Sequence, residues 1–248
     1  MNRSVTLSYQ QGIAAPTKIT DSLGHSISFD YDKEGRLVKL TDASGAIAQF
    51  VYDERGNLIL SKDATGYEVS YEYDTKGHLL ASSEGTSYKY DAKGNLIAIA
   101  DPKGNQQTFK YNENGLPVEI RLATGFWTKK IYDDRSRLVR TIDSAGTILD
   151  FLYDDRDQLV RRQEGTREEL FVYDDNGNLE RVRNGLTYET TYQYNENNQL
   201  IQVTDPEGNV TRYQYDIAGN LSKVVLPGGT IKETVYDPLK RPICEVSP

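Results

Sequence analysis

Hydrophobic and polar residues alternate along most of this chain in short stretches of five to seven residues. From Tyr67 to Tyr73, for example, apolar side chains occupy the odd positions, and Glu or Ser occupies the even ones. A period of two residues places alternate side chains on opposite faces of a β-strand. No stretch keeps a period of 3.6 residues. The pattern therefore predicts an all-β chain with almost no helix.

Each strand-like stretch ends in a tyrosine that is followed by Asp or Asn. Successive tyrosines of this kind are 21 residues apart, except for one interval of 17 and one of 20. The fourth residue after the tyrosine is Gly, except at Ser136, Asp157, Asn198 and Lys240. Spacing this regular identifies an internal repeat. We expect the following residues to build the repeats: Tyr31, Asp32, Gly35, Tyr52, Asp53, Gly56, Tyr73, Asp74, Gly77, Tyr90, Asp91, Gly94, Tyr111, Tyr132, Tyr153, Tyr173, Tyr194, Tyr215 and Tyr236.

A second turn signal, Asp-x-x-Gly, lies between the tyrosine turns, as at Asp42 to Gly45. Each repeat therefore contains two turns and two short strands, and consecutive hairpins form one long, curved antiparallel sheet. We expect a single domain over residues 1–248, with about eleven repeats of 21 residues and about 22 short strands. The segments from Leu79, Leu159 and Leu179 to the next Gly are two residues shorter than the segment from Leu37 to Gly45, which suggests tighter hairpins.

An odd repeat length constrains the register. Each tyrosine can emerge on the same face only if one loop of the repeat has an even number of residues and the other an odd number. A four-residue loop after Tyr31 would place Tyr31 opposite Arg36 and Phe29 opposite Val38. A three-residue loop at 43–45 would then place Phe50 opposite Val38. We expect this register because it gathers aromatic and aliphatic side chains on one face.

Composition excludes several classes of protein. Hydrophobic residues make up 37% of the chain and charged residues 27%, with a mean hydropathy of -0.64, so we expect no membrane span. A formal net charge of -8 disfavours a nucleic-acid partner, because phosphates require a basic surface. The segment Met1 to Tyr9 lacks the charged start and apolar run of a secretory signal.

Carboxylate clusters at Asp133 and Asp134, at 154–157, and at Glu168 and Glu169 are the candidates for acid/base chemistry. Clusters that fall on the turn of the repeat favour another role, because Asp at a turn accepts backbone N–H bonds. We therefore expect no catalytic residue among them.

Candidate metal ligands are few. Oxygen ligands near Asp53 to Asn57 would suit Ca²⁺, but the Gly-rich nonapeptide of calcium-binding β-rolls is absent. His25 and His78 lie in different repeats, and Cys244 has no His that would activate it. We expect no metal, no cofactor and no disulfide. Trp127, with a parity opposite to that of Tyr132, is the best single candidate for an exposed contact residue, although a buried irregularity is the more common outcome.

The motifs Tyr52-Asp53-Glu54-Arg55-Gly56-Asn57-Leu58 and Tyr215-Asp216-Ile217-Ala218-Gly219-Asn220-Leu221 resemble the YD repeat of the RHS family. That family includes bacterial polymorphic toxins, the B and C components of insecticidal toxin complexes, and animal teneurins. The resemblance implies that the hairpins form a sheet that spirals into a hollow shell, which in bacterial members encloses a toxin polypeptide. The repeat itself carries no catalysis there. Nothing after Tyr236-Asp237-Pro238 resembles the segment that plugs such shells.

The resemblance implies a structural function, as a wall segment of an encapsulating shell in a secreted or cell-surface toxin system. The implied partners are neighbouring RHS repeats and an enclosed toxin polypeptide. An extracellular adhesion or carbohydrate-binding module is the alternative, and we do not expect an enzyme.

The edges and faces of the sheet lead to two further expectations. Unless the sheet closes, its terminal strands near Ser4 to Tyr9 and Thr230 to Tyr236 would be unpaired and would recruit another copy. A chain with 18 Tyr, 6 Phe and no helices should curve around a space, which would leave the tyrosine hydroxyls at a wet surface.

Overall fold

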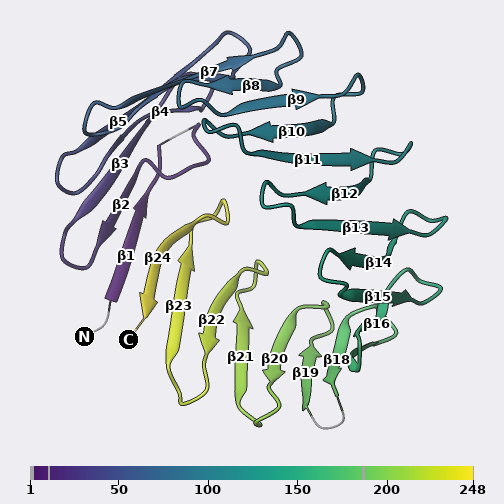
Figure 1. Cartoon of the computed structure of the whole chain (residues 1–248). Helices are drawn as coiled ribbons and strands as arrows, with labels where there is room; N and C mark the ends of the chain where they lie inside the picture. Colours follow the sequence, from purple (N-terminus) through teal and green to yellow (C-terminus); the bar gives the residue numbers. More distant parts are fainter. Residues whose placement is uncertain (1–2, 11, 186–187, 248) are drawn as a thin grey trace. The chain divides into compact units, whose positions relative to one another are not determined.

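The computed structural model describes residues 3–10, 12–185 and 188–247. All regular elements within these residues are β-strands, which form one antiparallel sheet (Figure 1). The strands are β1 Arg3–Ser8, β2 Lys18–Asp21, β3 Ser26–Tyr31, β4 Leu37–Thr41, β5 Ile47–Tyr52, β6 Leu58–Lys62, β7 Glu68–Tyr73, β8 Leu79–Ser82, β9 Ser87–Tyr90, β10 Leu96–Ala100, β11 Gln106–Tyr111, β12 Pro117–Arg121, β13 Trp127–Tyr132, β14 Leu138–Asp143, β15 Ile148–Tyr153, β16 Leu159–Glu164, β17 Arg167–Tyr173, β18 Leu179–Asn184, β19 Tyr188–Tyr194, β20 Leu200–Thr204, β21 Val210–Tyr215, β22 Leu221–Val225, β23 Ile231–Tyr236 and β24 Pro242–Ser247. The all-β prediction of repeated antiparallel hairpins is confirmed.

The described residues form 24 strands, two more than the eleven motif tyrosines predict. The additional pair is β1 and β2 at the amino end, which flank Tyr9. Tyr9 is followed by Gln10 instead of Asp or Asn, so the motif search missed this hairpin.

The chain divides into two compact units. Unit 1 comprises Met1–Tyr52, Leu60–Glu68 and Thr190–Pro248, and unit 2 comprises Asp53–Ile59 and Val69–Glu189. In unit 2, each strand from β8 to β17 pairs with the next strand along the chain.

The first and last strands pair with each other in unit 1. β1 pairs with β2 on one side and with β24 on the other, where Ser4 lies opposite Val246 and Thr6 opposite Cys244. The expectation of unpaired edges at Ser4 to Tyr9 and Thr230 to Tyr236 is therefore wrong. A further strand, β24, follows the second of these segments, and its backbone groups pair with those of β1.

The two turns of a repeat have the same size. After β3, Asp32 N donates to Arg36 O at 2.9 Å, and Gly35 N donates to Asp32 O at 3.0 Å. After β4, the corresponding bonds join Asp42 N to Ala46 O and Gly45 N to Asp42 O, both at 3.0 Å. Each turn thus closes a three-residue loop. The prediction was right for the second turn and wrong for the first.

A β-bulge keeps the tyrosines on one face. Tyr31 lies opposite Leu37 and Asp30 opposite Lys39, so Val38 is an extra residue in the return strand. Phe29 consequently lies opposite Leu40, and the predicted pairs with Arg36 and Val38 are wrong. The bulge restores the parity that we had assigned to a four-residue loop. The same shift of register appears in the other hairpins that follow a tyrosine, such as β13–β14 and β21–β22.

We call the face that carries the motif tyrosines the tyrosine face. In β5, Ala48, Phe50 and Tyr52 on this face are half-buried, whereas Ile47 and Val51 on the opposite face are 40% and 46% exposed. Val69 and Ala98, which are 8% and 6% exposed, are the only buried apolar residues among those described. Stability therefore depends on half-buried side chains and on hydrogen bonds repeated along the sheet, and not on a closed hydrophobic core.

Shortened repeats are built in two ways. The β8–β9 hairpin keeps a three-residue loop closed by Ser82 and Thr86, and its strands are only four residues long. The tighter turn predicted there is thus wrong. In the β16–β17 hairpin, Glu164 pairs directly with Arg167, which leaves a two-residue loop, as predicted. The third shortened turn includes residues 186 and 187, which lie outside the described residues.

The four turns that lack the motif glycine adopt the same left-handed conformation as the others. Their φ angles are 65° at Ser136, 62° at Asp157, 58° at Asn198 and 61° at Lys240. For a residue with a Cβ atom this conformation costs about 1–2 kcal/mol.

Replacing Ser136 by glycine should therefore stabilise the chain by about 1 kcal/mol, after allowance for the greater freedom of glycine in the unfolded state. Gly35 occupies the equivalent position with φ 79°, and no atom lies within 4 Å of the Cβ that it lacks. Gly35→Ser should be destabilising by a similar amount. Urea unfolding of both variants measures these changes, and changes of the same sign would contradict the prediction.

Candidate functional site

The motif tyrosines bind the backbone of the preceding repeat. Tyr52 Oη donates a hydrogen bond to Leu37 O at 2.9 Å. The backbone pairing of β4 with β5 ends at Lys39 and Gln49, so it does not include Leu37. Each hydroxyl thus satisfies a carbonyl at the start of a return strand, a partner that was not identified from the sequence. Equivalent bonds of 2.8–3.0 Å join Tyr31 to Pro16, Tyr73 to Leu58, Tyr90 to Leu79, Tyr111 to Leu96, Tyr132 to Pro117, Tyr153 to Leu138, Tyr173 to Leu159, Tyr215 to Leu200 and Tyr236 to Leu221.

Unit 1 contains the same bond between the two ends of the chain. Tyr9 Oη donates to Pro242 O at 2.9 Å, across 233 residues of sequence. Pro242 begins β24 as Leu37 begins β4, so Tyr9 is the tyrosine of the amino-terminal hairpin. The bond joins this hairpin to β24 in the same way as neighbouring repeats are joined.

The acid after each tyrosine holds the turn. Asp53 Oδ1 accepts the N–H groups of Arg55 at 2.9 Å and Asn57 at 2.8 Å, while Oδ2 accepts the Asn57 side chain at 2.8 Å. The hydrogen bond from the Asn57 side chain, which has the largest effect, and those from the backbone lower the pKa of Asp53 from its ordinary value. Because the turn already uses both carboxylate oxygens, the segment 53–57 does not resemble an open Ca²⁺ site.

At several turns, the residue five positions after the motif tyrosine covers the tyrosine ring of the next repeat. The Arg36 guanidinium lies 4.9 Å from the centre of the Tyr52 ring, and Arg137 lies at the same distance from Tyr153. This contact was missed from the sequence, although an Arg five residues after Tyr31 and Tyr132 is a visible signal. The tyrosine, the acid and the glycine thus form one unit that recurs along the chain, which we call the tyrosine module, and an arginine covers the ring at these two turns.

A histidine covers the ring at another turn. The rings of His78 and Tyr90 stack with their centres 4.7 Å apart, and His78 Nδ1 lies 2.8 Å from Asp74 Oδ2. The exposed His25 makes the same contact with Asp21 at 2.9 Å. Each Asp lies four residues before its His, a spacing that is visible in the sequence.

The candidate carboxylates are spread over different turns and faces. Asp133 and Asp154 cap turns through the N–H groups of their own loops, while Glu168 and Glu169 point to opposite faces of β17. Among the residues that the structure describes, no three His, Cys, Asp or Glu side chains gather as a metal site would require. Cys244, half-buried in β24, lies opposite Val235.

Trp127 lies on the face opposite to the tyrosines, as its parity predicts. Its side chain is half-buried, and the Lys129 ammonium lies 5.0 Å from the centre of its ring. The lysine thus covers the aromatic surface that the sequence singled out as a contact site.

Comparisons with known proteins agree with this repeat. The teneurin YD-shell family matches residues 8–160, and the RHS repeat matches residues 173–208 and 194–231. The crystal structure of TcdB2-TccC3-TEV is similar over 98% of this chain, with a TM-score of 0.56 and 16% identity. The structure of the Photorhabdus luminescens Tc holotoxin pore is similar over 97%, with a TM-score of 0.57 and 17% identity.

A third similar structure is that of TcdB2-TccC3 without the hypervariable C-terminal region, with a TM-score of 0.57 and 17% identity over 97% of this chain. The chain spans 17–18% of the length of these three solved chains. No curated protein matches it by sequence. Within the described residues, no helix has the length and apolarity that a membrane crossing requires.

Removal of one motif hydroxyl should destabilise the chain. Tyr153→Phe leaves the Leu138 carbonyl without this donor, which should cost about 1 kcal/mol, while the ring and its contact with Arg137 remain. Tyr188→Phe is the matched control, because Tyr188 is 61% exposed, and it should change stability by less than about 0.5 kcal/mol. Equal effects in urea unfolding would contradict a structural role for the hydroxyl.

The turn carboxylates should make stability fall in acid. The Asn220 side chain, followed by the Asn220 backbone, donates hydrogen bonds that lower the pKa of Asp216 below its ordinary value of 3.8. A lowered pKa stabilises the fold above the unfolded value, and this stabilisation is lost as the pH falls through the folded value. The loss should therefore occur below about pH 4.

Asp216→Asn should reduce the difference in stability between pH 7 and pH 3. Asn112→Asp should increase it, because Asn112 Oδ1 accepts the Asn114 and Leu116 N–H groups in an equivalent turn. Urea midpoints at the two pH values measure the difference. If both substitutions leave it unchanged, the turn carboxylates do not cause the acid sensitivity.

Proposed function

Because the chain belongs to the teneurin YD-shell family and also contains RHS repeats, we propose that it functions as a wall segment of an encapsulating shell. We further propose that residues 1–248 act as one repeat domain with a structural role. The observation that carries this proposal is the tyrosine module, which binds each hairpin to the next one.

The tyrosine module supports a wall because each repeat depends on its neighbours. A hairpin buries little apolar surface by itself, and the motif hydroxyl donates to a carbonyl outside its own hairpin. In unit 1, β1 pairs with β24 and Tyr9 donates to Pro242, so the same two interactions also join the first and last hairpins of the chain.

The cargo that we propose is a toxin polypeptide, as part of a secreted or cell-surface toxin-delivery system. Support comes from similarity to structures that contain TcdB2 and TccC3 and to a Tc holotoxin pore. The proposed partner is therefore the enclosed polypeptide, because the pairing of β1 with β24 leaves neither of these strands as a free edge for further repeats.

We propose no catalytic activity for the repeats. The candidate carboxylates Asp133 and Asp154 accept backbone hydrogen bonds in their own turns. The His78 ring packs against Tyr90 and contacts Asp74, so its position suits a structural role.

Protease protection tests the proposed function. The polypeptide that carries this chain, purified as its host produces it, should contain a segment outside the repeats that survives a protease able to digest it after denaturation. Combined Tyr111→Phe, Tyr132→Phe and Tyr153→Phe should speed digestion, because three bonds between neighbouring repeats are lost.

Digestion of that segment at the same rate before and after denaturation would overturn encapsulation. Specific glycan binding by a polypeptide without a protected segment would instead support the adhesion module.

A further inference from the structure

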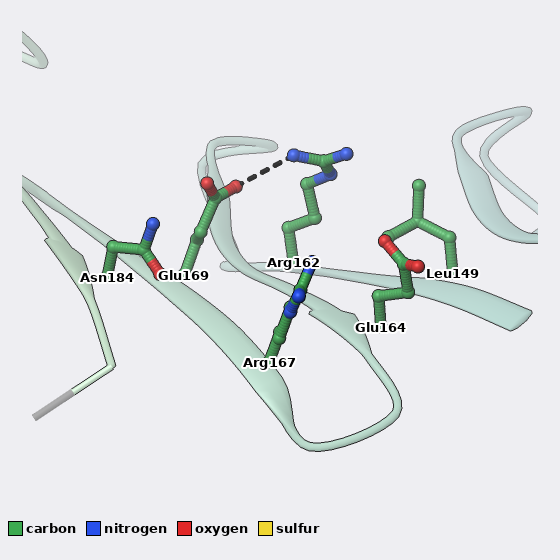
Figure 2. Close-up of a pocket in the computed structure, with 6 residues that line it drawn as sticks. All are labelled: Leu149, Arg162, Glu164, Arg167, Glu169 and Asn184. Atoms are coloured by element: carbon green, nitrogen blue, oxygen red, sulfur yellow. Dashed lines mark hydrogen bonds and ion pairs between the residues drawn. The ribbon is translucent and has the colours of Figure 1, made fainter.

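Unit 2 contains a charged depression on its tyrosine face, beside the β16–β17 hairpin. It has a volume of about 270 Å³, and Figure 2 shows its side chains around a common space. The lining residues are Leu149, Arg162, Glu164, Arg167, Glu169 and Asn184.

The register shows why these charges share one face. Arg162 lies opposite Phe151 on one neighbouring strand and Glu169 on the other, and Glu169 lies opposite Asn184. Phe151 has the same parity as Tyr153 in β15, so all four side chains belong to the tyrosine face.

Charge at these positions is unusual in the repeat. The residue equivalent to Arg162, three after the start of the return strand, is Leu40 in β4, Ile99 in β10 and Val182 in β18. A charged side chain there replaces apolar packing against the neighbouring strands. This difference requires a reason beyond the construction of the sheet.

Two of the four charged side chains form an ion pair with each other, and the other two do not. Arg162 Nη1 lies 2.9 Å from Glu169 Oε2, and this ion pair is the dashed line in Figure 2. Glu164 and Arg167 are also cross-strand neighbours, yet within the described structure no hydrogen bond or ion pair involves either side chain. The depression therefore presents one free carboxylate and one free guanidinium beside a formed ion pair.

The short hairpin explains the free carboxylate. In a full-length turn, the equivalent Asp42 Oδ1 accepts the N–H groups of Ser44 and Ala46 at 2.8 Å and 2.9 Å. The two-residue loop between Glu164 and Arg167 lacks these N–H groups in a position to cap the acid. In the shorter loop the Glu164 carboxylate therefore does not cap a turn, and it lines the depression instead.

We propose that this depression binds an extended polypeptide segment that carries a cationic and an anionic side chain two residues apart. Glu164 would accept hydrogen bonds from the cation, and Arg167 would donate to the anion. Side chains at positions i and i+2 of an extended peptide point the same way, about 6.6 Å apart, so one peptide can present both charges to Glu164 and Arg167, which lie opposite each other on neighbouring strands. The Leu149 side chain provides an apolar contact for the intervening methylene groups.

Unit 1 contains a related depression of about 440 Å³, with Lys232 and Glu245 in its lining. Lys232 occupies the repeat position of Glu169, four residues before the motif tyrosine, and Glu245 occupies that of Arg162. Both units thus place opposite charges at the same two repeat positions, with the signs exchanged. Lys232 lies opposite Val224, however, so unit 1 does not repeat the direct pairing of Arg162 with Glu169.

The inference deepens the proposed function, because the bound segment would belong to the enclosed polypeptide. The binding test uses an added peptide and the purified 248-residue chain. Its result is therefore separate from the protease test, which reports enclosure and not charge recognition.

A nine-residue peptide of alternating Thr-Lys-Thr-Glu sequence is the probe, with fluorescence anisotropy as the readout. It should bind at least about tenfold more tightly than peptides with only Lys or only Glu, because each of those meets a like charge. Arg167→Gln and Glu164→Gln should each weaken binding of the mixed peptide by a similar factor.

Arg121→Gln is the matched control, because Arg121 pairs with Trp127 on the opposite face and should not affect binding. Exchange of Glu164 and Arg167 for each other keeps both charges, so the mixed peptide should still bind in the reversed direction. Absence of binding, equal binding of all three peptides, or equal weakening by Arg121→Gln and Arg167→Gln would overturn the proposal. Unfolding curves of each variant verify that it is folded.

Discussion

The hydrogen bond from a motif tyrosine to the preceding repeat is the interaction on which the rest of the structure depends. The Tyr153 hydroxyl, for example, reaches the Leu138 carbonyl at 3.0 Å, while its ring lies beneath Arg137. A phenylalanine would provide the ring but not the donor, which explains why tyrosine is so much more frequent than phenylalanine. One side chain thus provides both packing and backbone pairing where a closed core is missing.

This interaction requires every tyrosine to emerge on the same face of the sheet. Two loops of equal size in a repeat of 21 residues would place successive tyrosines on opposite faces. The bulge at Val38 and its equivalents resolves the conflict, because one additional residue in the return strand reverses the parity. Both turns can then keep the same Asp-capped, three-residue loop. The left-handed residue of that loop remains left-handed even where it is Ser136 or Lys240, so the bonds between repeats outweigh local strain at those turns.

Departures from the repeat place side chains that the wall itself does not require. The short β16–β17 hairpin leaves Glu164 outside any turn and brings it beside Arg167 on the tyrosine face. Arg162 and Glu169 neutralise each other there, so two opposite charges remain available to a partner. Irregular repeats in a regular sheet are therefore the places where a binding site for a partner is most easily identified.

The sequence by itself determined the repeat, most of its strands and the positions of its turns, because alternation and the Tyr-Asp-x-x-Gly spacing are local properties of the chain. It also identified Ser136 and Lys240 as positions that lack the motif glycine, whereas their left-handed conformation is seen only in the structure. The bulge at Val38, the acceptor of each tyrosine hydroxyl and the pairing of β1 with β24 were decided only in the tertiary structure. A three-residue loop with a bulge satisfies the same parity as a four-residue loop, so the alternation of side chains does not distinguish them, and the hydrogen bonds between neighbouring strands select one.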